Sequence, residues 1–154
     1  MEKIRRILVP IKGNGLDDDE AVRFACAIAK RNKAKVVAVF VIEVPRALPL
    51  DAEVPEALEE GERSLQRAEA VAEEVEEEIE TEMLQARLAG PAIVDEAHER
   101  GVDLIIIGLP YRTRFGEFYL GSTATYVLKN AQCRVWLCRV YMEGSCSVAN
   151  MDKV

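Results

Sequence analysis

Residues 103–107 read Asp103-Leu104-Ile105-Ile106-Ile107, in which one aspartate is followed by an unbroken run of four branched apolar side chains. Such a run is typical of a strand that is buried on both faces of a sheet. Similar runs lie at 7–11, 36–42 and 135–140, and a more polar one at 81–88. Because strands of this kind are covered by helices on both sides, the pattern predicts a parallel sheet inside an α/β domain.

The segments between these runs carry apolar residues at helical spacing. Helices are predicted from Asp17, from Glu56 to about Glu78, from Gly90-Pro91 and from Gly121-Ser122-Thr123. The predicted inner faces comprise Ala21, Ala25, Ile28 and Ala29, then Leu58, Leu65, Ala68, Ala72, Val75 and Ile79, then Ile93, Val94 and Ala97, and last Ala124, Val127, Leu128 and Ala131. Five strands therefore alternate with four helices, which predicts three layers and right-handed crossovers.

Composition and charge narrow the classes of function. The chain has 154 residues, enough for one domain, and a net charge of -7. An excess of acidic groups disfavours nucleic acid and anionic membranes as partners. The apolar run at 7–11 is too short for a secretory signal, and no stretch approaches the ~20 apolar residues of a membrane helix. We therefore expect a cytoplasmic protein.

The cysteines and the histidine do not form a metal motif. Cys26, Cys133, Cys138 and Cys146 include no Cys-x-x-Cys pair, and His98 is the only histidine. We expect free thiols, no metal site, and His98 at the rim of its helix rather than in a catalytic role.

Two segments between predicted elements leave alternatives open. Residues 43–55 contain three prolines, so they form either a functional cover or a tether that reaches a distant helix. The glutamates between 56 and 78 are interpreted as a solvated helix face rather than a partner site.

Sheets of this class bind ligands beyond the carboxyl ends of their strands, where the strand order reverses. The two loops expected there are 12–16 and 108–120. The first contains Gly13-Asn14-Gly15, but Asp18 stands where a dinucleotide loop has its third glycine. Acidic residues also crowd the following helix start, so a turn with a helix cap is favoured over a phosphate cradle.

The second loop offers better chemistry for an anion. Gly108 is expected to end its strand, and Gly121 lets a backbone approach closely. Ser122 and Thr123 supply hydroxyl and N–H groups at a helix start, where the helix dipole favours anions. Arg112 and Arg114 could complete such a site. A serine helix cap beside a solvated loop explains the same residues equally well.

The spacing of Gly108, Tyr111 and Gly121-Ser122 resembles the Gly-x2-Gly-x9-Gly-Ser/Thr signature of universal stress proteins. The segments 7–11, 90–93 and 127–135 are also similar to that family, and the resemblance covers residues 4–140. It implies a five-stranded parallel sheet of order 3-2-1-4-5 in an adenine nucleotide alpha hydrolase-like fold. The domain would span 1–140, followed by a tail at 141–154, and serve as a homodimeric, regulatory stress-response module.

The resemblance also implies a ligand site, carried over position by position. Lys12 stands where the ATP-binding branch has an aspartate, and Tyr111 replaces the second glycine of the signature. The implied site residues are Pro10, Ile11, Lys12, Val41, Gly108, Tyr111, Arg112, Gly121, Ser122 and Thr123. One hypothesis is a module that binds ATP, AMP or another phosphate-bearing ligand at this site, with Lys12, Arg112 and Arg114 supplying positive charge. The alternative is an interaction protein of the branch that binds no nucleotide.

Catalysis is not expected, because no nucleophile–base pair and no Walker loop is apparent; slow nucleotide hydrolysis rests on family analogy alone.

The last predicted strand, 135–140, is apolar on both faces and should lie at a sheet edge. We expect an antiparallel edge-to-edge homodimer through Val135, Leu137 and Arg139. The alternative places Trp136 in the core, with no partner needed.

Overall fold

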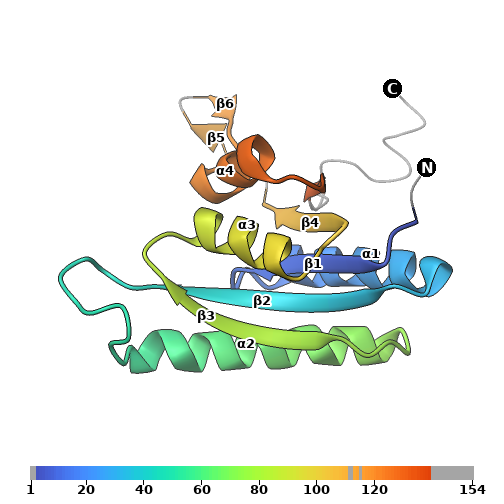
Figure 1. Cartoon of the computed structure of the whole chain (residues 1–154), viewed down its shortest axis with the longest axis horizontal. Helices are drawn as coiled ribbons and strands as arrows, with labels where there is room; N and C mark the ends of the chain where they lie inside the picture. Colours follow the sequence, from blue (N-terminus) through green and yellow to red (C-terminus); the bar gives the residue numbers. More distant parts are fainter. Residues whose placement is uncertain (1–2, 111–112, 115, 140–154) are drawn as a thin grey trace.

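The computed structural model describes residues 3–110, 113–114 and 116–139. Its elements alternate along the chain as the apolar runs predict (Figure 1). Their bounds are β1 Arg6–Ile11, α1 Leu16–Asn32, β2 Lys35–Glu43, α2 Pro55–Glu74, β3 Glu80–Ala86, α3 Ala89–Glu99, β4 Leu104–Leu109, β5 Thr113–Arg114, β6 Glu117–Phe118, α4 Ser122–Asn130 and β7 Arg134–Arg139.

The main sheet has five parallel strands in the order β3-β2-β1-β4-β7. Counting only these strands, the order is the expected 3-2-1-4-5, and the predicted fold class is confirmed. The short antiparallel pair β5–β6 was not foreseen, since the sequence indicates only a loop between β4 and α4. β1 and β4 are neighbours, so the strand order reverses between them.

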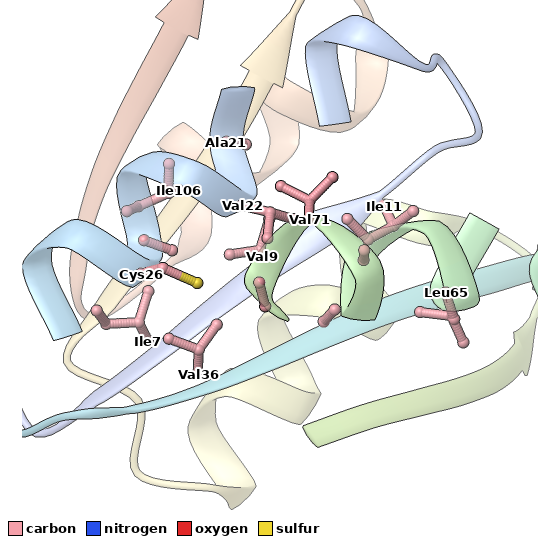
Figure 2. Packing of buried hydrophobic residues seen from close by; sticks show 14 of the residues in the cluster. Ile7, Val9, Ile11, Ala21, Val22, Cys26, Val36, Leu65, Val71 and Ile106 are labelled. Carbon is pink, nitrogen blue, oxygen red and sulfur yellow. The ribbon is translucent and has the colours of Figure 1, made fainter. Parts of the chain in front are cut away.

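Helices cover both faces of the sheet. α1 and α2 pack on one face, with the cluster shown in Figure 2, and α3 and α4 pack on the other. Alternate residues of β4 serve the two clusters, because successive side chains of a strand point to opposite faces. Ile106 packs toward α1, whereas Ile105 and Ile107 pack toward α3 and α4, and all three are fully buried. Each such side chain stabilises the fold by roughly 1.5–3 kcal/mol.

Several details of the predicted helices are wrong. α2 ends at Glu74 rather than near Glu78, and Glu76 adopts a left-handed φ of 60°. The glutamates that follow would place negative charge at the negative end of the helix dipole, which favours an early end. Leu58 and Leu128, both predicted to face inward, are exposed. Helical spacing predicts which face of a helix is apolar, but how much of that face is buried depends on the strands and helices that pack against it.

The segment between β2 and α2 is fastened by two side chains near the end of β3. Nη1 of Arg87 donates hydrogen bonds to the carbonyl oxygens of Pro45 (2.7 Å) and Leu48 (2.8 Å). Nε2 of Gln85 donates to those of Leu50 (2.9 Å) and Ala52 (3.0 Å). These bonds tie the segment to the β3 edge, which favours the tether over the cover.

Candidate functional site

One cavity of about 280 Å³ lies at the carboxyl edge of β1 and β2, between the starts of α3 and α4. It gathers seven of the ten residues expected at the site. Its lining comprises Pro10, Ile11, Lys12 and Asn14 after and within β1, Val39, Phe40, Val41 and Glu43 of β2, Ala89 and Ile93 of α3, and Leu120, Gly121, Ser122 and Thr123 at α4. The first and last of these residues, Pro10 and Thr123, are more than a hundred positions apart in the sequence, and the fold of the sheet brings them to one cavity.

The loop after β1 is held by a carboxylate of the chain itself. Asp18 accepts hydrogen bonds from the backbone N–H groups of Lys12 (3.1 Å), Gly13 (2.8 Å) and Asn14 (3.0 Å). These donors are the ones that a phosphate cradle would offer, and they are already taken. The loop is therefore a turn tied to the start of α1, as its acidic residues favour.

Burial raises the pKa of the Asp18 carboxyl above its ordinary 3.8, although the three N–H donors act in the opposite direction; the charge of Asp17 raises it further. Next to it, Asp19 forms a two-pronged ion pair with Arg67 of α2, at 2.9 and 2.7 Å. The guanidinium of Arg67 also lies close to Gly15. α2 thus fixes the base of the loop that carries Lys12.

The start of α4 presents unpaired backbone donors to the cavity. Gly121 is its N-cap, with a left-handed φ of 88° that favours glycine, and it makes no side-chain capping bond. The N–H groups of the first turn have no partner within the helix, since the first intrahelical bond closes from Thr125 to the carbonyl of Gly121. No acidic residue occupies this turn. The arrangement suits an anion.

Gly108 has a different environment from the one expected. It does not line the cavity, and β4 continues through Leu109 instead of ending at Gly108. A Cβ at Gly108 would lie 2.1 Å from the carbonyl oxygen of Asp17, so glycine here lets α1 approach the sheet. The glycine of the family signature thus serves helix packing in this chain.

Three further basic or aromatic positions were expected near the site. Tyr111 and Arg112 lie outside the described residues. Arg114 has its backbone in β5, paired with Glu117 of β6. Sequence reasoning missed the other seven lining residues, which are Asn14, Val39, Phe40, Glu43, Ala89, Ile93 and Leu120. Glu43 carried one signal in the sequence, its place at the carboxyl end of a strand, but its contact with Ala89 depends on the fold.

Within the described ranges, no cluster of three or more His, Cys, Asp or Glu side chains could hold a metal ion. His98 is exposed and lines a separate pocket beside Cys133. Cys26, Cys133 and Cys138 are free thiols, and burial raises the pKa of each of them. In that same part of the chain, no helix is long and apolar enough to cross a membrane.

Comparison with known proteins decides the family. The model of the universal stress protein family matches residues 3–139. The chain belongs to the universal stress protein family. A curated relative, the universal stress protein MJ0531 of Methanocaldococcus jannaschii, is 36% identical over 137 residues, which cover 85% of this chain and 79% of the relative.

Solved universal stress proteins share the fold. The Archaeoglobus fulgidus protein in complex with dAMP superimposes with a TM-score of 0.70 at 22% identity, over 88% of this chain and 98% of that one. An Arabidopsis thaliana family member with AMP bound gives a TM-score of 0.64 at 14% identity, over 95% and 99% of the two chains. The architecture of this universal stress protein is thus that of proteins solved with nucleotides.

Proposed function

We propose that this universal stress protein is a cytoplasmic regulatory module that binds an adenine nucleotide, or another phosphate-bearing ligand, in the cavity between α3 and α4. The observation that carries the proposal is the open start of α4 at Gly121-Ser122-Thr123, which aims unpaired N–H groups into that cavity. Lys12 adds positive charge across the cavity, and Ile11, Val41 and Leu120 offer apolar surface for a base.

The proposed role is binding rather than catalysis. The described lining contains no histidine or cysteine, and its one carboxylate, Glu43, is engaged with a backbone N–H. Relatives solved with dAMP and AMP support a nucleotide as the ligand. ATP and AMP are both candidates, and so is a smaller phosphate-bearing molecule.

Calorimetric titration with AMP, ATP and inorganic phosphate tests the proposal. Two variants at the first position of α4 separate the donors. Ser122→Ala removes only the hydroxyl, whereas Ser122→Pro also removes an N–H while keeping the helix start, because proline is favoured there. We expect Ser122→Pro to weaken binding about tenfold and Ser122→Ala to weaken it less. Absence of heat from every ligand with the wild-type protein would overturn the proposal.

The second candidate is a homodimer formed along β7, with or without a nucleotide. β7 is an edge of the described sheet, and its Trp136 is 39% exposed, too much for a core residue. Val135 and Leu137 are half-buried, because they pack in part against the cluster beneath α3 and α4. An unpaired apolar edge favours pairing with a second copy. Sedimentation velocity at micromolar concentration should show a dimer, and Leu137→Lys should shift it to a monomer; a wild-type monomer contradicts this proposal.

A further inference from the structure

The two helix starts at the cavity are in opposite electrostatic states. At α3, the backbone N–H of Ala89 donates to Oε2 of Glu43 at 3.2 Å, so a carboxylate of the chain already occupies this helix start. At α4, Gly121 provides no side-chain cap and no acidic residue lies in the first turn. A ligand phosphate is attracted to the α4 end and repelled from the α3 end.

The strands place Glu43 and Lys12 on the same face of the sheet. Val39 and Val41 pack toward α3 and α4, and Glu43 follows them at the same alternation along β2. Ile11 pairs with Phe40, so Lys12 comes level with Val41 on the neighbouring strand. Strand spacing and rise then put the Cα atoms of Lys12 and Glu43 about 8 Å apart.

Apolar surface fills the space between these charges. Val39, Val41, Ile93 and Leu120 line the same cavity, which is large enough to receive part of a planar base. A ligand that places its phosphate at α4 therefore directs its uncharged end along this apolar floor toward Glu43. The chemistry of that end must suit a carboxylate, which accepts hydrogen bonds and donates none.

We propose that Glu43 is the specificity-determining residue of this cavity and selects nucleotides whose base carries an amino group. This inference rests on the proposed function. The carboxylate oxygen that does not accept from Ala89 receives a hydrogen bond from the amino group of the base. A base with a carbonyl oxygen at that position sets two acceptors against each other. Because Glu43 is exposed at the rim of the cavity, water reduces this penalty, so the site disfavours such a base without excluding it.

Competing titrations with AMP and inosine monophosphate, whose base has an oxygen in place of the amino group, test the inference. We expect the wild-type protein to bind AMP about tenfold more tightly. Glu43→Gln should abolish or reverse this preference, because the amide offers a donor as well as an acceptor. Its carbonyl can still accept from Ala89, so the start of α3 is kept, and circular dichroism verifies the fold. Glu99→Gln, the same substitution at the exposed far end of α3 and outside the cavity, should leave the preference unchanged.

The outcomes separate the two proposals. If the wild-type protein binds both nucleotides equally, or if Glu43→Gln retains the preference for AMP, the role of Glu43 is overturned while nucleotide binding stands. The comparison of the two ligands on the wild-type protein needs no variant, so equal binding overturns the role of Glu43 even if Glu43→Gln fails to fold. If neither nucleotide, ATP nor phosphate binds, both proposals fall.

Discussion

Gly108→Ala tests whether this signature glycine serves the packing of α1. The new Cβ would lie 2.1 Å from the carbonyl oxygen of Asp17, 2.8 Å from its carbonyl carbon and 3.3 Å from Cβ of Ala21. The first two atoms are backbone and cannot rotate away, so α1 must move off the sheet. α1 buries Ala21, Val22 and Cys26 against that sheet, so this movement opens a tightly packed interface.

Overpacking of this kind costs about 1–3 kcal/mol, and contact with rigid backbone places Gly108→Ala toward the upper end. A smaller gain of about 0.4–1 kcal/mol comes from the lower entropy of the unfolded chain. We therefore expect the free energy of unfolding to fall by about 2 kcal/mol, which lowers Tm by roughly 4–8 °C in a domain of this size.

Urea unfolding followed by circular dichroism measures this loss. Gly101→Ala is the control, because Gly101 has a left-handed φ of 64° but its nearest neighbour would be Nη1 of Arg6 at 3.5 Å, an ordinary contact. It should cost about 1 kcal/mol from backbone strain alone. If Gly108→Ala is as stable as the wild-type protein, the packing argument is refuted. If that stable variant also loses ligand binding, Gly108 has the ligand-contacting role that the signature implies.

Two further predictions concern titratable groups. The raised pKa of Asp18 means that the folded state holds this proton more tightly than the unfolded state, so its contribution to stability is greatest below pH 3.8 and declines as pH rises toward the folded pKa. The Tm difference between wild type and Asp18→Asn should therefore shift against the wild type across that window, and a difference that stays constant contradicts the argument. Burial, with a smaller contribution from the charge of Glu77, raises the pKa of Cys26 to about 11, and the thiol is fully buried. Peptide mass spectrometry after brief iodoacetamide treatment at neutral pH should find Cys26 modified only in denaturing urea, and rapid labelling of the folded protein would show that the α1 interface opens readily.

The candidate site was predictable only in part. The glycine and serine at 121–122 indicate a helix start. The acidic run at 17–20 indicates a turn tied to the start of a helix rather than a phosphate cradle. Glu43 was missed because its significance depends on Ala89, which is 46 positions away and reaches it only through the crossover that returns α3 over the sheet. Leu58 and Leu128 share the helical spacing of buried residues, but no neighbouring element covers them.

The sequence by itself determined the parallel sheet, its strand order through the family resemblance, and the helix starts. The sheet and the helix starts follow from local patterns, namely unbroken apolar runs, helical spacing, and glycine, proline or acidic residues where a helix begins, all of which act within a few positions of the chain. Only the tertiary structure decided that α1 packs closely against the backbone at Gly108 and that Lys12 and Glu43 line the same cavity. Those relations depend on strand register and on the crossing of elements distant in sequence, which residue periodicity does not encode.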